Sequence, residues 1–231
     1  MDGYKGKFFS VLGDSISTFK GYSEPYGAAY YDEDRKLAAN VILPEDTWWG
    51  RVIERLDGFR LINNSAWGSM VTKQSYCYTE SYACSDERTS ALDWNEQMPD
   101  VIMVFMGTND WGGGVKIDPK DGETGDISYF SYAYVTMLEK LKNNYPNAEI
   151  WCFTLPVSKN TRKENFSFPY FYGGVHIEKY CDAIRACAEK CGCRVIDLYR
   201  SDIRYDTIDG FHPNFDGMKT IADAVIAQLE A

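Results

Sequence analysis

The sequence lacks both a long apolar run and a cluster of positive charge. No stretch stays apolar over the roughly 20 residues that a membrane-spanning helix needs, so we expect no stable association with a membrane. Lysine and arginine total 24 against 34 aspartate and glutamate residues, and the basic residues are scattered along the chain. The resulting formal net charge of −10 would repel a nucleic-acid backbone or an anionic membrane surface. These absences exclude both as expected partners.

A secretory signal and a paired-cysteine framework are also missing. Residues 1–7 lack the basic start and the apolar core of a signal peptide and lead directly into a predicted strand. The seven cysteines are an odd number, and four of them crowd one segment without a paired C-x-x-C pattern: Cys181, Cys187, Cys191 and Cys193. Structural zinc sites usually draw on two such pairs, and disulfide-rich secreted domains are much smaller than this chain. We therefore expect free thiols, no metal and a cytoplasmic location.

Short apolar runs alternate with helical patterns along the whole chain. The 231 residues can bury one large core and contain no Pro/Gly/Ser linker, so we expect a single domain over residues 1–231. Predicted strands cover residues 7–12, 59–63, 101–106, 149–154 and 194–198, and predicted helices cover 47–56, 91–97, 128–144, 173–190 and 214–230. This alternation predicts an α/β fold, a three-layer α/β/α sandwich around a mainly parallel five-stranded sheet. Residues 19–46 show no sustained period, so we expect a long loop there.

A serine follows the first predicted strand in a tight turn. The segment G-D-S-I-S at residues 13–17 places Ser15 at the carboxyl edge of the sheet, where open α/β sheets collect their active-site loops. A serine nucleophile needs a base, and the base needs a third group to orient it. Of only two histidines, His212 has Asp209 three residues before it, across a glycine, whereas His176 lies in a helical pattern and is expected to be a surface or packing residue. We therefore predict Ser15, His212 and Asp209 as catalytic residues.

Two further segments offer donors for the negative oxygen of a tetrahedral intermediate. Gly68 follows the second predicted strand in N-S-A-W-G, and Asn109 follows the third in G-T-N-D. A glycine lets its backbone N–H approach a ligand closely, and an asparagine amide donates directly. With the backbone N–H of Ser15, these residues form a predicted oxyanion hole. Taken singly, Gly68 and Asn109 are better explained as a turn glycine and as an asparagine that caps a turn.

These four segments resemble the blocks of the SGNH, or GDSL-like, hydrolase family. The residues that name the family are matched, in order, by Ser15, Gly68, Asn109 and His212, and Asp209 falls in the family's D-x-x-H motif. The matching blocks extend from residue 13 to residue 212. The resemblance implies a flavodoxin-like α/β/α fold, no metal or organic cofactor, and hydrolysis of carboxylic esters through an acyl-serine intermediate.

The substrate is less clearly indicated. The loops near the predicted site are rich in aromatic residues, which can stack on sugars, line an acyl pocket or simply form the core of the loops: Tyr22, Tyr26, Tyr30, Tyr31, Trp111, Phe168, Tyr170, Phe171 and Tyr172. We expect Asp14, Trp67 and Trp111 to bind substrate. Ile16 stands where the family usually has leucine, and Trp67 stands where smaller residues are frequent, which leaves the shape of the acyl pocket open.

We favour removal of a short acyl group, such as acetyl, from a carbohydrate or another small-molecule ester. Three alternatives stay open: a lysophospholipase or thioesterase, an acyltransferase that uses the same residues, and a non-catalytic carbohydrate-binding protein on the same fold. The sequence leaves the oligomeric state open, and also whether residues 19–46 cover the site.

Overall fold

A computed structural model describes residues 2–22, 29–74, 81–118, 125–159 and 169–231. Its centre is a five-stranded sheet in which every neighbouring pair of strands is parallel. In spatial order the strands are β2 (Phe59–Ser65), β1 (Phe8–Gly13), β3 (Val101–Phe105), β4 (Glu149–Phe153) and β8 (Arg194–Ile196). All five residues of β3 are buried, as expected for a strand covered on both faces. The predicted α/β fold with a parallel five-stranded sheet is confirmed.

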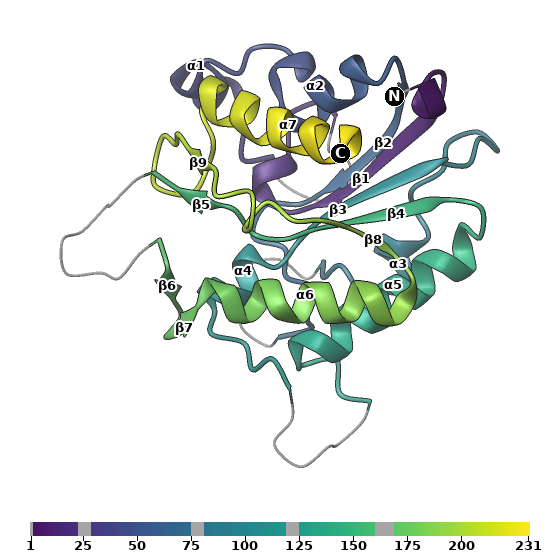
Figure 1. The fold of residues 1–231 in the computed structure, drawn as a ribbon, viewed down its shortest axis with the longest axis vertical. Coiled ribbons are helices and arrows are strands. Elements are labelled where there is room, and N and C mark those ends of the chain that lie inside the picture. Colours follow the sequence, from purple (N-terminus) through teal and green to yellow (C-terminus); the bar gives the residue numbers. More distant parts are fainter. Residues whose placement is uncertain (1, 23–28, 75–80, 119–124, 160–168) are drawn as a thin grey trace.

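Helices cover both faces of the sheet (Figure 1). On one face α2 (Trp48–Arg55) packs beside α7 (Phe215–Glu230). On the other face lie α3 (Asp86–Thr89), α5 (Phe130–Asn144) and α6 (Ile177–Cys191). The remaining helices of the described chain are η1 (Asp2–Tyr4), η2 (Ser15–Ser17), α1 (Glu33–Ala39), η3 (Pro44–Asp46) and α4 (Thr108–Gly112). In the described part of the chain, no helix combines the length and the apolar composition needed to cross a membrane.

Two short strand pairs lie outside the main sheet. β5 (Val157–Ser158) pairs in parallel with β9 (Arg204–Tyr205), and β6 (Phe171–Tyr172) pairs antiparallel with β7 (Val175–His176). The second pair corrects the helix predicted over residues 173–190. Gly173 and Gly174, with φ of 56° and 80°, form a tight hairpin turn, and the helix begins only after His176. The Nδ1 atom of His176 accepts a hydrogen bond from the Glu178 N–H at 3.1 Å and so caps α6.

The helix predicted over residues 91–97 is wrong. Trp94 and Gln97 exchange backbone hydrogen bonds, and the two residues between them have the positive φ angles of a tight turn. Two consecutive left-handed residues exclude an α-helix. The helix lies earlier, in α3, where the Ser85 side chain caps its first turn by accepting from the Arg88 N–H.

The expectation of a continuous loop over residues 19–46 is also wrong, because α1 and η3 lie within it. The side chain of Asp32 accepts from the Arg35 N–H at 3.0 Å and starts α1, and Asn40 ends it with a φ of 55°. The helix escapes a periodicity argument because it is short and charged, and Ala39 alone of its residues is buried. The remaining predicted strands and helices end within two residues of the observed ones.

Candidate active site

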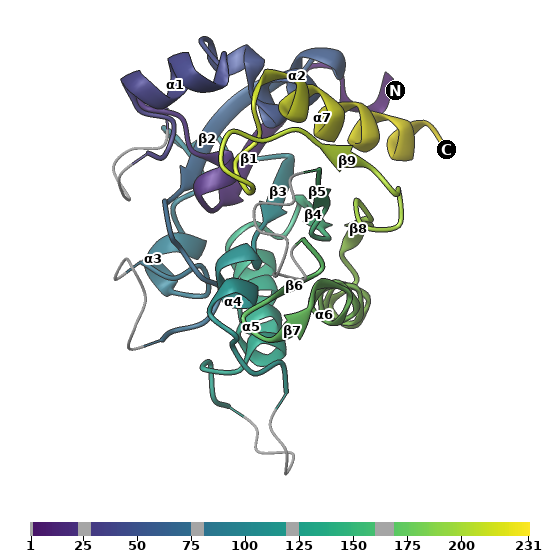
Figure 2. The ribbon, with the colours of Figure 1, turned by 90° about the vertical axis from the view of Figure 1, so that its left-hand side faces the viewer.

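Three of the predicted site segments follow neighbouring strands of the sheet. β1, β2 and β3 run in register, with Gly13 paired to Ser65 on one side and to Phe105 on the other. Their carboxyl ends therefore lie together, and η2, the Gly68 turn and α4 follow these strands in the chain. Figure 2 shows β2, β1 and β3 next to one another, together with α4. A side chain at Gly13 would place its Cβ 2.6 Å from the Ser17 side chain and 2.7 Å from Ser65 Oγ. Glycine is thus required for the Ser15 turn to lie against β2.

The structure brings Ser15, His212 and Asp209 into one hydrogen-bonded row. Oγ of Ser15 lies 2.8 Å from Nε2 of His212, and Nδ1 of His212 lies 2.7 Å from Oδ2 of Asp209. An ionised carboxylate only accepts, so Nδ1 carries the proton and Nε2 is left to accept from the serine hydroxyl. Ser15 and His212 are 197 positions apart in the chain, so their contact forms only when the protein folds.

The turn before α7 determines where the imidazole lies. Gly210, with φ of 104°, lets the chain fold back, so that Oδ1 of Asp209 accepts from the backbone N–H groups of Phe211 and His212 at 3.0 and 2.9 Å. Directly afterwards the Asn214 side chain caps α7 by accepting from the Gly217 N–H at 2.9 Å. The imidazole is thus held between a hydrogen-bonded turn and the start of a helix.

The carboxylate of Asp209 is strongly stabilised in its charged form. Partial burial alone would raise its pKa. The hydrogen bond and charge of His212, the His212 backbone N–H and the Tyr30 hydroxyl outweigh this effect and hold the pKa of Asp209 well below its ordinary value. Asp209 therefore stays ionised across the pH range in which a histidine titrates.

The two other predicted donors, Gly68 and Asn109, lie in segments that are joined by a hydrogen bond. Gly68 is buried and has a φ of 73°, a conformation that favours glycine. Asn109 lies in the first turn of α4, and its Nδ2 donates to the carbonyl of Ser69 at 2.9 Å. Because an amide nitrogen carries two hydrogens, Asn109 has a second N–H for a bound oxygen. The contact keeps the glycine turn and the asparagine at the same place.

Two buried charged residues that sequence reasoning missed fix these loops. Both oxygens of Asp110 bind the segment after Gly68, with contacts of 2.8 and 3.1 Å to the N–H groups of Val71 and Thr72 and 2.8 Å to the Thr72 hydroxyl. Burial, opposed by these donors, raises the pKa of Asp110 to about 6. The fully buried Arg88 donates to the carbonyls of Gly13 and Asn64 at 3.1 and 2.7 Å. Arg88 lies in a short helix with charged neighbours, and nothing in that sequence indicates that its side chain is buried.

The three predicted substrate-binding residues have different positions. Asp14 has no exposed surface. Its Oδ1 accepts from the Ile16 N–H at 3.0 Å, so Asp14 is the N-cap of η2. Trp111 is 3% exposed, and its Nε1 donates to the Val175 carbonyl at 2.7 Å. Only Trp67, which is 41% exposed, presents its ring to solvent. Among the aromatic residues predicted near the site, Tyr26 and Phe168 lie outside the described residues.

The buried carboxyl of Asp14 leads to a prediction about folding stability. Burial, partly opposed by the Ile16 N–H and the Thr108 side chain, raises the pKa of Asp14 to about 7, whereas the unfolded chain has the ordinary value near 3.8. Between about pH 4 and 7 the folded state therefore binds the proton more tightly, so this group makes the protein less stable as pH rises. In Asp14→Asn this contribution is absent, and the loss of stability between pH 5 and pH 7.5 is expected to shrink by a few kcal/mol. Urea unfolding at the two pH values measures the difference, and equal losses in both proteins would contradict the shift.

Part of the segment between β1 and α2 covers the histidine. The ring of Tyr30 lies parallel to the imidazole of His212, with centroids 3.3 Å apart, and its hydroxyl donates to Oδ2 of Asp209 at 2.6 Å. The sequence marked Tyr30 only as one of several aromatic residues in an irregular segment. Its proximity to the site depends on the tertiary fold.

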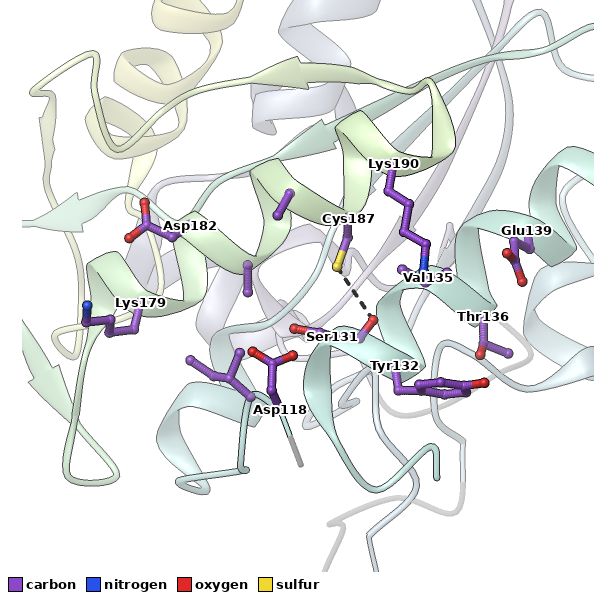
Figure 3. Close-up of a pocket in the computed structure, with 13 residues that line it drawn as sticks. Asp118, Ser131, Tyr132, Val135, Thr136, Glu139, Lys179, Asp182, Cys187 and Lys190 are labelled. Atoms are coloured by element: carbon purple, nitrogen blue, oxygen red, sulfur yellow. Dashed lines mark hydrogen bonds between the residues drawn. The ribbon is translucent and has the colours of Figure 1, made fainter. Parts of the chain in front are cut away.

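A large groove lies away from these residues in the described part of the chain. The groove has a volume of about 850 Å³, runs between α5 and α6 and is lined by residues such as Ser131, Thr136, Lys179 and Cys187 (Figure 3). None of the predicted site residues lines it, so we do not assign it to the reaction. A cavity of about 10 Å³ lies beside the Ser15 turn, and its lining includes Ile16, Trp111 and Phe211. It offers the space of about one water molecule.

The chain is similar to one known protein family and to several solved structures. The family model described as GDSL-like Lipase/Acylhydrolase matches residues 7–166. No curated protein matches the chain. A Bacteroides uniformis ATCC 8492 protein described as a GDSL-like lipase is 28% identical, with a TM-score of 0.72 and coverage of 97% of this chain and 96% of that chain.

Two further solved structures are similar in fold. A Bacteroides ovatus ATCC 8483 protein described as a GDSL-like lipase has a TM-score of 0.75 at 24% identity, with coverage of 98% of this chain and 99% of that chain. A family two carbohydrate esterase from Clostridium thermocellum, in complex with cellohexaose, has a TM-score of 0.61 at 15% identity. That comparison covers 98% of this chain and 64% of the esterase.

Proposed function

Because the chain belongs to the GDSL-like lipase/acylhydrolase family, we propose that it hydrolyses carboxylic esters through an acyl intermediate on Ser15. The family match ends at residue 166, before the turn that carries His212. The observation that carries the proposal is therefore the geometric one, the continuous row from Asp209 through His212 to Ser15 with contacts of 2.7 and 2.8 Å.

In the first half of the proposed reaction, Oγ of Ser15 attacks the ester carbonyl while Nε2 of His212 takes its proton. The imidazolium that forms is stabilised by the ionised Asp209 and then gives the proton to the leaving alcohol. In the second half, His212 takes a proton from water, and the resulting hydroxide attacks the acyl-serine. Collapse of this intermediate releases the acid and returns the proton to Ser15, so the enzyme is regenerated without a cofactor.

The negative oxygen of each tetrahedral intermediate would be bound by three N–H donors. We assign this role to the backbone N–H groups of Ser15 and Gly68 and to the second N–H of Asn109. Donors that are already in position stabilise the charge without rearranging, which is usually the largest single contribution to catalysis in such sites. The hydrogen bond from Asn109 to the Ser69 carbonyl and the Asp110 contacts support this role, because they hold two of the donors before substrate binds.

For the substrate we favour a short acyl group, such as acetyl, on a carbohydrate or another small-molecule ester. The cavity beside the Ser15 turn has room for only about one water molecule and so offers no apolar space for a long acyl chain, in which each added methylene must be buried. Trp67, one residue before Gly68, is 41% exposed although the Arg35 guanidinium lies over its ring, so part of its apolar surface is open to contact with a sugar. The fold is shared with a carbohydrate esterase in complex with cellohexaose, which is compatible with this class of substrate.

An ester screen tests the proposed function. Acid release is measured from acetylated sugars and from nitrophenyl esters of increasing chain length. We expect turnover of the acetyl esters and falling kcat/KM as the chain grows. A rise in kcat/KM with each methylene would favour a lysophospholipase or thioesterase, and a higher rate of ester consumption without acid release when an alcohol is added would favour an acyltransferase. Sugar binding without turnover of any ester would favour a non-catalytic binding protein.

Activity is expected to depend on pH through the imidazole of His212. The base must be neutral to accept the serine proton, so kcat/KM should rise with pH as the imidazole loses its proton. Asp209 adds no titration in this range because its pKa is held well below the ordinary value. Initial rates between pH 5 and pH 8 check the profile, and a flat profile over that interval would exclude His212 as the base.

A further inference from the structure

We propose that Tyr30 is a positioning residue of this site, which holds Asp209 and His212 in the orientation that Ser15 needs. This inference rests on the proposed function for the reaction that it assists. Its physical content, the coupling of the Tyr30 hydroxyl to the proton affinity of His212, is measurable without any substrate.

The first contact is a hydrogen bond to the carboxylate. The hydroxyl of Tyr30 donates to Oδ2 of Asp209 at 2.6 Å, and the same oxygen accepts from Nδ1 of His212 at 2.7 Å. The other oxygen of Asp209 is engaged by two backbone N–H groups. Both carboxylate oxygens of Asp209 therefore accept hydrogen bonds. Of the four donors named here, Tyr30 alone lies outside the Asp209–His212 turn.

The second contact is with the ring of the base itself. The rings of Tyr30 and His212 are inclined by only 10°, with centroids 3.3 Å apart, and Tyr30 is 6% exposed. At such a separation the imidazole cannot rotate about its χ2 angle without a clash. The tyrosine ring thus prevents the imidazole from turning away from Ser15.

Tyr30 is in turn fixed to the segment that carries the nucleophile. Its backbone N–H donates to Oγ1 of Thr18 at 2.8 Å, and the Thr18 hydroxyl donates to the carbonyl of Ser15 at 2.9 Å. The Arg35 guanidinium lies over the rings of both Tyr30 and Trp67, 4.9 Å from each centroid. One residue therefore links the Ser15 turn to the Asp209–His212 turn, and α1, which carries Arg35, packs against it.

The hydroxyl should also affect the proton affinity of the base. A donor on Oδ2 of Asp209 withdraws part of the negative charge that stabilises an imidazolium, so its removal should make His212 hold its proton to a higher pH. Other ionisable or charged groups around the imidazole and its partners come from the N-cap of η2, the segment before α1, α1 itself and β9: Asp14, Tyr31, Arg35 and Tyr205. A Tyr30→Phe change leaves all of them in place.

The decisive experiment compares Tyr30→Phe with Tyr31→Phe. Tyr31 is fully buried beside it, and its hydroxyl donates to the Pro213 carbonyl at 2.6 Å rather than to the carboxylate. Each variant loses one buried hydroxyl from the same segment. Thermal unfolding of both variants checks that they fold.

The readout is the pH titration of the histidine ring resonances by NMR. The protein has only two histidines, and His176→Asn identifies the signal of His212. In Tyr30→Phe we expect the midpoint of His212 to rise by roughly half a unit to one unit, and the acidic limb of kcat/KM to move with it. In Tyr31→Phe both should stay at the wild-type position. A midpoint in Tyr30→Phe that is unchanged or lower would overturn the inference.

The kinetics separate positioning from a merely structural role. We expect Tyr30→Phe to lower kcat at the pH plateau by a few-fold, and Tyr30→Leu, which also removes the stacked ring, to lower it by at least about 10-fold with little change in KM. A Tyr30→Leu variant that folds and retains the wild-type kcat would overturn the role of the ring. If the wild-type protein hydrolyses no ester, the proposed function fails, whereas the NMR comparison still decides the coupling between Tyr30 and His212.

Discussion

Ser15→Ala is expected to abolish ester hydrolysis, with kcat lower by about 10⁴-fold to 10⁶-fold. The alanine has no atom that can attack the carbonyl, so only binding and the oxyanion donors would remain to assist water. The fold should be unaffected, because the Ser15 side chain makes its one described hydrogen bond with His212, whereas its carbonyl still accepts from Thr18. Steady-state kinetics with an acetyl ester, together with thermal unfolding, measure both effects.

Ser10→Ala is the matched control for this variant. Ser10 lies in β1, five positions before Ser15, and its buried hydroxyl donates to the Leu92 carbonyl at 2.7 Å. This change removes a buried serine hydroxyl from the strand that leads into the Ser15 turn without touching His212, so turnover should survive at some cost in stability. Activity of Ser15→Ala at the parental level would rule out Ser15 as the nucleophile.

Asn109→Ala is expected to lower kcat by about 10²-fold to 10³-fold with little change in KM. The lost amide would bind the charged intermediate and not the neutral ester. Its removal should therefore raise the free energy of the transition state without weakening the binding of the ester. The variant also loses the bond to the Ser69 carbonyl, which loosens the Gly68 turn and adds to the loss. Kinetics under saturating and limiting substrate separate kcat from KM.

Asn144→Ala is the corresponding control, because Asn144 at the end of α5 also donates its amide to a backbone carbonyl, that of Thr89, at 2.9 Å. It should lose stability only. If Asn109→Ala instead raised KM and left kcat intact, Asn109 would be a substrate-binding residue and the oxyanion hole would need another donor.

The sheet could be predicted from the sequence because its strands are short apolar runs that end at glycine or polar residues. The run at residues 101–106 is apolar throughout and forms β3, buried over its whole length. Helix starts were also predictable where a capping side chain stands before an apolar pattern, as Thr47 does before α2 and Asn214 before α7. These signals are local, and local contacts determine the elements that they mark.

The errors arise where local signals are weak or conflict. Residues 91–97 contain enough apolar spacing for a helix, but Asn95 and Glu96 adopt left-handed conformations, which a pattern of apolar residues does not reveal. In α1 the opposite holds, since a charged segment forms a helix through its caps and has almost no apolar face. At residues 173–176 the two glycines allow a hairpin turn, whereas the sequence pattern runs on into the helix.

Some residues of the site could be predicted from the sequence and others could not. Ser15, Gly68, Asn109 and His212 could be selected from their chemistry and from their positions after predicted elements. The residues that hold them could not, because Arg88, Asp110 and Tyr30 act through contacts with segments far away in the chain. The contact between Tyr30 and Asp209, for example, joins positions that are 179 residues apart. No sequence period or motif records such a pairing.

Covalent labelling shows directly whether Ser15 is the reactive nucleophile. The intact protein is incubated with a fluorophosphonate at neutral pH, digested, and mapped by mass spectrometry. We expect one phosphonyl group on the peptide that contains Ser15, none in Ser15→Ala, and slower labelling when His212 is replaced by alanine. Labelling confined to another residue, or equal labelling of the wild-type protein and Ser15→Ala, would contradict this expectation.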